Sequence, residues 1–135
     1  SDMTVIPESM FQGCSKLENI DLPPGFTDIG ERAFSGTAIK SFVIPKEMTT
    51  IRWGTFSYCK QLEEVTLPPN LTAIEERAFM YCTSLKRVIQ ADGSCNEGEF
   101  FIPEGVTAIG DCAFDGCSNL ESLTIPFVGG SKSAI

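Results

Sequence analysis

A short pattern that recurs five times constrains the fold of this chain more than any other feature. Each copy has an apolar residue, a threonine, an isoleucine two residues after the threonine, and a phenylalanine five residues after the isoleucine. The five phenylalanines are separated by 23, 22, 23 and 35 residues. Self-similarity at a period of about 20 to 30 residues is typical of solenoids, in which each copy is one coil stacked on the next. The copies occupy residues 3–11, 26–34, 48–56, 71–79 and 106–114.

A second pattern lies between the phenylalanines and has the same period. It reads Phe-x-Gly/Tyr-Cys-x-x-Leu-x-x-φ-x-φ-Pro, where φ is apolar, and it fits residues 11–23, 56–68 and 114–126. Residues 34–45 follow it with one residue fewer, with Thr37 in the place of the cysteine and Ile39 in that of the leucine. The φ-x-φ alternation predicts a short strand with one buried face, which the proline ends because it cannot donate to a ladder. The φ-Thr-x-Ile stretch predicts a second extended segment on the opposite side of the coil. We therefore predict about five coils of 22–23 residues around one continuous core.

The combined pattern resembles the BspA-type bacterial leucine-rich repeats. The strings IGERAF at 29–34 and IGDCAF at 109–114 match that family closely, and the resemblance extends from residue 3 to residue 126. It implies a curved solenoid with a parallel β-sheet on the concave face and short strands and turns on the other side. It also implies a secreted or cell-surface protein that takes part in adhesion or protein–protein contact. The family has no conserved functional site, so the resemblance assigns no residue roles.

The length and the ends of the chain predict one repeat domain that was cut from a longer array. At 135 residues, the chain is long enough for a single domain with a substantial core. It enters in the middle of a coil, without a signal peptide, so we expect residues 1–135 to be a fragment with further coils. Residues 127–135 lack the repeat and are expected to form an exit or linker segment.

Composition disfavours several classes of function. The net charge of −8 disfavours nucleic acids and anionic membranes, and weakly favours basic partners. The chain has no histidine, which removes the usual catalytic dyads and the commonest metal ligand. We therefore expect no enzymatic activity and no cofactor, and a protein partner such as a host surface or matrix protein. The oligomeric state stays open.

The six cysteines fall into two groups. Four of them occupy the same slot of the repeat and are expected to be small buried core residues without disulfides: Cys14, Cys59, Cys82 and Cys117. Cys95 and Cys112 lie outside that slot, and a bridge between them is an open alternative in a secreted protein.

The fourth copy is interrupted by an insertion of 12 residues, at 90–101. Its glycine, aspartate and asparagine residues favour turns, so we expect a protruding hairpin or loop. Insertions in solenoids often serve binding, but a merely tolerated loop is equally compatible with the sequence. The candidate binding residues of this loop are Asp92, Asn96, Glu97 and Glu99.

The order of Asp92, Ser94 and Asn96 resembles the start of a calcium-binding loop. However, glycine stands at the seventh place instead of the sixth, and the twelfth place holds Pro103 instead of glutamate. We therefore expect no metal site.

The remaining candidates for function are the outward residues of the predicted strands. By alternation they flank the buried φ positions, and in leucine-rich repeats this is the usual partner-binding face. We hypothesise an extracellular interaction or adhesion module; the alternative is a structural spacer without a ligand of its own. The candidate residues are Asn19, Asp21, Ser41, Val43, Glu64, Thr66, Arg87, Ile89, Ser122 and Thr124.

Overall fold

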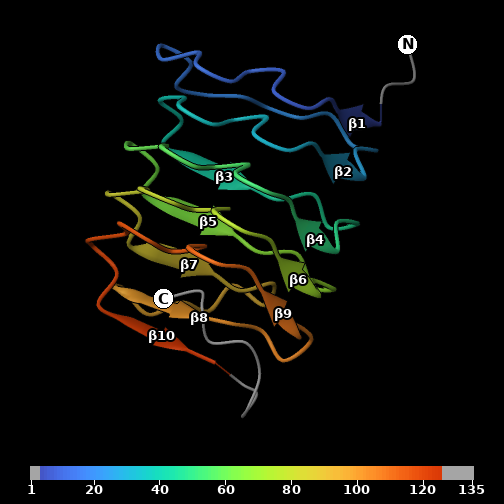
Figure 1. The fold of residues 1–135 in the computed structure, drawn as a ribbon. Coiled ribbons are helices and arrows are strands. Elements are labelled where there is room, and N and C mark those ends of the chain that lie inside the picture. Colours follow the sequence, from blue (N-terminus) through green and yellow to red (C-terminus); the bar gives the residue numbers. More distant parts are fainter. Residues whose placement is uncertain (1–3, 126–135) are drawn as a thin grey trace.

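The protein, seen in a computed structural model that describes residues 4–125, is a β-solenoid of stacked coils (Figure 1). All strand pairs in this part of the chain are parallel, and it contains no helix. The predicted solenoid is therefore confirmed. The expected exit segment at 127–135 lies outside the described residues. The strands are β1 (Val5–Ile6), β2 (Asp28–Ile29), β3 (Ser41–Val43), β4 (Thr50–Ile51), β5 (Glu64–Thr66), β6 (Ala73–Ile74), β7 (Arg87–Ile89), β8 (Glu99–Phe101), β9 (Ala108–Ile109) and β10 (Ser122–Thr124).

The strands form two rows on different sides of the coils. One row comes from the φ-Thr-x-Ile stretches and contains the pair β1-β2 and the sheet β4-β6-β9. The other row comes from the φ-x-φ stretches and contains the sheet β3-β5-β7 and the pair β8-β10, with β8 beside β7 (Figure 1). We call the outward surface of this second row the strand face.

The phenylalanine of each coil lies in a tight turn segment, and these segments form a third side, here called the turn face. Backbone hydrogen bonds join neighbouring turn segments. In the third coil, the amides of Gly54, Phe56 and Tyr58 donate to carbonyls of the fourth coil at 3.0, 2.9 and 2.7 Å.

Each turn segment contains two residues with positive φ, one two places before the phenylalanine and one two places after it. Positive φ suits glycine because a Cβ atom is strained there. The positions before the phenylalanine are Ser9, Arg32, Gly54, Arg77 and Cys112, and those after it are Gly13, Gly36, Tyr58, Tyr81 and Gly116.

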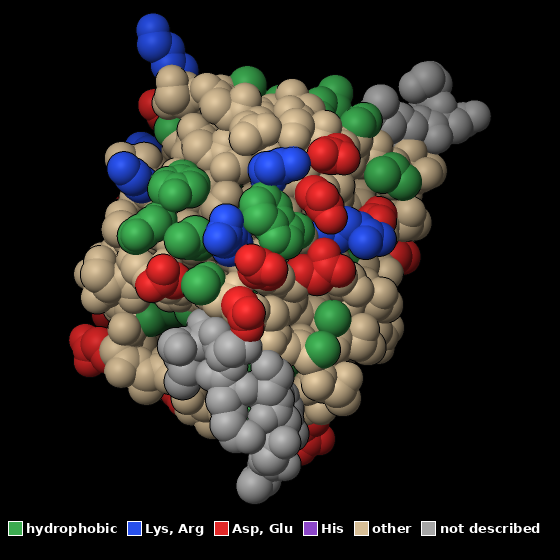
Figure 2. Space-filling view, viewed as in Figure 1, with side chains coloured by type: hydrophobic (Ala, Val, Ile, Leu, Met, Phe, Trp, Pro, Cys, Tyr) green, Lys and Arg blue, Asp and Glu red, His purple; other side chains and the backbone are tan. Residues whose placement is uncertain are grey.

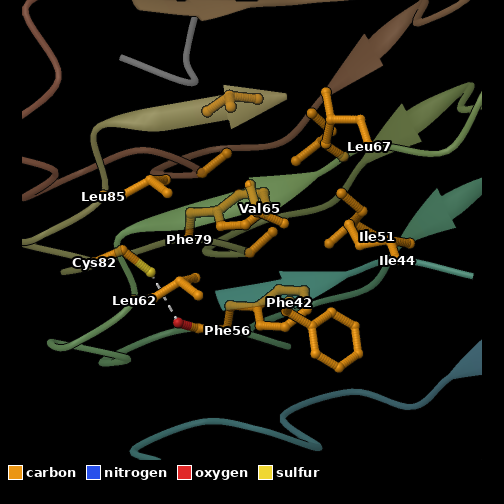
Figure 3. Packing of buried hydrophobic residues seen from close by; sticks show 14 of the residues in the cluster. Phe42, Ile44, Ile51, Phe56, Leu62, Val65, Leu67, Phe79, Cys82 and Leu85 are labelled. Atoms are coloured by element: carbon orange, nitrogen blue, oxygen red, sulfur yellow. Dashed lines mark hydrogen bonds between the residues drawn. The ribbon is translucent and has the colours of Figure 1, made fainter. Parts of the chain in front are cut away.

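The core is a column of stacked phenylalanines with aliphatic residues around it (Figure 3). Neighbouring rings of the column lie nearly parallel, with centroids 5.4 to 5.9 Å apart. Two strand residues pack against this column, each between two of its rings: Phe42 lies 5.1 Å from Phe34 and 5.3 Å from Phe56, and Phe100 is placed in the same way further along. One core therefore runs through all the coils, as the repeat predicts.

The cysteines of the repeat add hydrogen bonds between coils. The thiols of Cys59, Cys82 and Cys117 are buried and donate to the carbonyl of the preceding coil's phenylalanine, at 3.0, 3.0 and 3.1 Å (Figure 3 shows the bond of Cys82). The prediction of buried, unbridged cysteines is confirmed for these three. Cys14 is also a free thiol, but the prediction of burial is wrong for it, because its coil has no earlier coil packed against it in the described part of the chain.

Burial also changes the acidity of these thiols. Desolvation raises the pKa of Cys59 to about 11 and that of Cys117 to about 12, and it raises the pKa of Cys82 as well. Cys95 is exposed and Cys112 is half-buried, and both are free thiols. The bridge considered between them is therefore not formed in this structure.

Candidate binding surface

The outward residues predicted from strand alternation all reach the surface. Four lie on the first and second coils, at Asn19, Asp21, Ser41 and Val43, and all four are exposed. The six on later coils are exposed or half-buried, and they alternate with buried residues such as Val65 and Val88. The register of β3, β5 and β7 places these outward residues in rows across the coils, as in Ser41, Glu64 and Arg87.

The insertion differs from the expected protruding loop, because its last part is a strand. β8 pairs in parallel with β10, and its middle residue Phe100 is fully buried. The physical reason is that Phe100-x-Ile102-Pro103 is another φ-x-φ-Pro stretch, so this segment can bury one face in the same core. Glu99, which was expected in the loop, is therefore a strand residue.

Gly98 joins this extra strand to the coils on both sides. Its amide donates to the carbonyl of Lys86 at 2.7 Å, and its carbonyl accepts from the amides of Glu121 and Ser122 at 2.6 and 3.1 Å. Its φ of 83° is a conformation that glycine adopts without strain. The interrupted copy therefore contributes two neighbouring strands to the strand face, whereas β6 and β9 on the other side pair directly.

Arg87 is the centre of an ion-pair cluster on the strand face. Its Nε lies 3.1 Å from Oε1 of Glu64, and Nη2 lies 3.5 Å from Oε1 of Glu63. Its Nη1 reaches Oε2 of Glu97 in the inserted loop at 3.1 Å. The hydrogen bond to Glu64 is the main cause that raises the pKa of Arg87. The guanidinium thus links two coils and the loop, and leaves an excess of negative charge around it.

The other loop candidates make contacts within the insertion or to β10. Asn96 Nδ2 donates to Glu99 Oε1 at 2.9 Å, and Thr124 Oγ1 donates to the other oxygen of Glu99. Both hydrogen bonds lower the pKa of Glu99, and the bond from Thr124 has the larger effect. Asp92 accepts bonds from the Ser94 hydroxyl and amide at 2.7 and 2.9 Å, which lower the pKa of Asp92. These bonds hold Glu99 and Thr124 in place on the strand face, and the ion pair with Arg87 holds Glu97 there.

Two hollows open on the strand face. The larger, of about 710 Å³, lies between the first two coils, where residues 19–26 line one side and 41–47 the other. The smaller, of about 350 Å³, lies at the insertion, where Val88, Gln90, Cys95 and Phe101 are among the lining residues. Seven of the predicted surface or loop residues line these hollows: Asn19, Asp21, Ser41, Val43, Asp92, Asn96 and Glu99.

Phe101 is a surface residue that the sequence reasoning missed. It is the outward residue of β8 and is 41% exposed. Its carbonyl accepts a hydrogen bond from Gln90 Nε2 at 3.0 Å, which ties the two ends of the insertion together. The sequence could have identified Phe101 through the φ-x-φ-Pro stretch that ends at Pro103, since this stretch makes Phe101 the outward residue between two inward ones.

Charge is mixed over the visible surface in spite of the negative total. Figure 2 shows acidic, basic and hydrophobic side chains close together over the middle coils, without a large region of one sign. Arginine–glutamate and arginine–aspartate pairs account for part of this mixture, including Arg52–Asp28 at 2.6 Å. In residues 4–125, no helix is long and apolar enough to cross a membrane.

Known proteins share this architecture. A crystallised leucine-rich cell surface protein from Faecalibacterium prausnitzii is 34% identical, with a TM-score of 0.71, and the match covers 89% of this chain but 28% of that protein. A leucine-rich repeat protein from Bacteroides capillosus is 26% identical, with a TM-score of 0.59, over 92% of this chain and 78% of that one. A third, from Bacteroides ovatus, is 26% identical, with a TM-score of 0.56, over 90% of this chain and 40% of that one. A comparison with curated proteins found no match.

The family assignment follows from the repeats themselves. The model of the BspA type leucine rich repeat region matches residues 1–94 and 91–129, in six copies. Within residues 4–125, the match covers the phenylalanine column, the two rows of strands and the turn face. This chain belongs to the BspA-type leucine-rich repeat family.

Proposed function

We propose that this chain is a protein-interaction module of a bacterial cell surface, and that it binds its partner through the strand face and the insertion. The observation that carries the proposal is the placement of the interrupted copy. Its extra strand adds Glu99 and Phe101 to the predicted surface, and its loop is held there by the pair Glu97–Arg87. Exposed side chains that differ between coils thus lie on one surface, on a rigid scaffold that fixes their positions.

The character of the surface favours a partner with basic side chains. Glu63, Glu64 and Glu97 surround one arginine, and the whole chain has a net charge of −8. Complementary charge accelerates encounter and selects partners, while the exposed Phe101 and Val43 supply apolar contact area. No catalytic step belongs to this proposal, since leucine-rich repeat proteins of this type typically act by binding. The cell-surface location is inferred from the printed description of the Faecalibacterium relative.

The test is binding of the fragment to immobilised host surface and matrix proteins, measured by surface plasmon resonance. Three single variants remove side chains of the proposed site: Glu64→Ala, Glu97→Ala and Phe101→Ala. Each is expected to weaken binding about fivefold to hundredfold, which corresponds to an energetically important interface residue that contributes about 1–3 kcal/mol. Deleting 90–101 is unsuitable because it would remove β8 from the sheet. Gln12→Ala is the matched control, since Gln12 is exposed on the turn face.

The outcomes separate the site from the function. Binding that all three variants leave unchanged would place the partner site elsewhere. Absence of binding to every candidate protein would favour the alternative function, a structural spacer whose larger protein carries recognition in other coils.

A further inference from the structure

The strand side of the solenoid is open between the first and second coils. β3 is the first strand of its row, and it pairs with β5 along one edge only (Figure 1). The hollow of about 710 Å³ lies at the other edge, between residues 41–47 and residues 19–26 of the first coil. Among residues 4–125, no backbone group of 19–25 hydrogen-bonds to another backbone group. β3 therefore has a free edge that faces a hollow.

The same two coils are joined on their other sides. On the turn face, the amide of Phe11 donates to the carbonyl of Ala33 at 2.8 Å, and in the other row β1 pairs with β2. Just before the hollow, the amide of Ala38 donates to the carbonyl of Leu17 at 2.9 Å. The opening is therefore confined to the strand side, and the rest of the fold holds its two walls in place.

The sequence explains why the first coil forms no strand at this place. Its outward positions hold Asn19 and Asp21, and both residue types are depleted in β-strands. The second of these positions is β-branched in the next three coils, at Val43, Thr66 and Ile89. β-Branched side chains favour strands. The first coil thus keeps the inward apolar residues of the repeat without the outward residues that favour pairing.

Ser41 and Val43 direct their backbone groups toward the hollow. In a sheet, alternate residues of a strand bond to the neighbour on one side. The amide of Ile44 donates to the carbonyl of Thr66 at 3.0 Å, so the groups of Phe42, two residues earlier, also face β5. The amides and carbonyls of Ser41 and Val43 consequently face away from β5, and they have no backbone partner within residues 4–125. A strand edge of this kind is a template for a further strand.

The size and the apolar lining of the hollow fit a short extended chain. Strands rise about 3.3 Å per residue, are spaced about 4.8 Å apart in a sheet and occupy a layer about 10 Å thick, so one extended residue fills roughly 160 Å³. About four residues would therefore fill the hollow. Ile20 and Leu22 line it and are half-buried, whereas the same positions of the third coil, Val65 and Leu67, are buried. Apolar side chains at alternate positions of an occupant would cover them.

The charges at the hollow favour basic or neutral side chains on the occupant. Asp21 and Glu47 line it together with a single basic residue, Lys46. All three are exposed, and no ion pair involves them within residues 4–125. With a net charge of −8 on the whole chain, the local excess of one carboxylate disfavours an acidic occupant.

We propose that an extended segment of a partner protein binds in this hollow and adds a strand to the free edge of β3. The edge requires an occupant with an amide and a carbonyl at every second residue, which an extended backbone provides and a helix does not, because a helix bonds these groups internally. The bound segment has apolar residues at alternate positions and basic or neutral polar residues between them. This inference rests on the proposed function, since it takes the strand face as a protein-binding surface and names the form of the bound partner.

The experiment begins with a displayed library of heptapeptides in which Val, Ile, Leu or Phe alternates with Lys, Arg, Ser or Thr. Peptides that the fragment selects are synthesised and added to the ¹⁵N-labelled fragment, and amide exchange is followed by NMR. At saturation, exchange of the Ser41 and Val43 amides should slow at least about tenfold, because both gain a hydrogen-bond partner. A copy of the peptide that is N-methylated at every amide keeps the side chains and should not bind, because it cannot donate to the edge.

Two substitutions at one residue separate the backbone contact from the side chain. Val43→Pro removes an amide that faces the hollow, while the ladder to β5 does not use this amide, so the edge strand should still form. It should weaken peptide binding at least about tenfold. Val43→Thr keeps the amide and a β-branched side chain, and its affinity should stay within about threefold of the parent. Circular dichroism checks that both variants are folded; if Val43→Pro is not, the exchange of Ser41 and Val43 in the parent decides.

Four results would overturn the proposal. They are a library without any binder, binding that leaves Ser41 and Val43 unprotected, equal binding by the N-methylated peptide or by folded Val43→Pro, and protection of Val43 that rises with the concentration of the fragment alone. The last result would assign the edge to a second copy of this chain. Failure of the proposed function is seen separately, in the assay with host proteins and the variants Glu64→Ala, Glu97→Ala and Phe101→Ala.

Discussion

The phenylalanine column makes the sharpest stability prediction, at Phe56. This residue is 1% exposed and has a ring on each side, Phe34 at 5.9 Å and Phe79 at 5.4 Å, with Phe42 tilted against it at 5.3 Å. Phe56→Ala removes the ring from the middle of the core. Inter-coil hydrogen bonds, such as Phe56 to Ala78 at 2.9 Å, fix the spacing of the coils and prevent collapse into the cavity. We expect the free energy of unfolding to fall by about 3–5 kcal/mol.

Phe11→Ala is the matched comparison at the end of the column. Phe11 is half-buried and stacks on one ring only, Phe34 at 5.4 Å. About half of the apolar area of a buried phenylalanine is at stake, so the expected loss is about 1–2 kcal/mol. Nearest-neighbour coupling between coils accounts for this gradient from the middle to the end of the column.

Urea unfolding measures both variants, with far-UV circular dichroism for the strands and the fluorescence of Trp53 for the middle coils. Trp53 is the only tryptophan and lies between Arg32 and Arg77, whose guanidinium groups are 4.9 and 5.5 Å from its ring. Coincident transitions would establish that the coils unfold together. A loss below about 1 kcal/mol for Phe56→Ala, or equal losses for the two variants, would refute the stacked column as the main source of stability.

Three further predictions concern a close backbone contact, the thiols and the ion-pair cluster. Gly110→Ala should lower the free energy of unfolding in urea by about 1–3 kcal/mol, because the added Cβ atom would lie 2.3 Å from the amide nitrogen of Glu76 in the preceding coil. An unchanged urea midpoint would contradict the packing of these coils. Burial raises the pKa of Cys59 from 9.0 to about 11, so the buried thiol stabilises the fold below pH 9 and loses this contribution as the pH rises to about 11. Cys59→Thr introduces the residue found in the same slot at Thr37, and this variant should lose less stability than the parent between about pH 9 and 11. An equal loss in the two proteins would refute the raised pKa of Cys59. Arg87→Ala should leave the urea midpoint nearly unchanged, because exposed ion pairs are screened by solvent. It should nevertheless speed amide exchange in 91–97 by freeing Glu97, and unchanged exchange would show that the ion pair does not hold the loop.

The regular part of the fold could be predicted from the sequence because each residue that repeats has one structural role. The inward residues Phe42, Val65 and Val88 follow from alternation alone, and the stacking of Phe34 and Phe56 follows from the period. These positions have the same surroundings in every coil, so five copies of one pattern define them.

The irregular features could not be predicted in the same way, because they depend on contacts between residues far apart in sequence. The pair Arg87–Glu97 and the strand partners of β8 follow from how the insertion folds back, which spacing does not specify. Cys14 shares its slot with Cys59 but lacks the earlier coil that would bury it. The alternation of glycine and tyrosine in the slot of Tyr58 and Tyr81 was visible as a pattern, but the left-handed backbone that favours glycine there was not.

The proposed binding surface depends on the strand that the interrupted copy adds, with a short exposed loop before it. Hydrogen–deuterium exchange tests this directly on the fragment without any partner. Residues 98–102 should exchange at least about tenfold more slowly than 91–97, because Gly98 donates to Lys86 and Ile102 donates to Thr124 while 91–97 are exposed. Equal and fast exchange across 91–102 would contradict the extra strand, and with it the proposed surface.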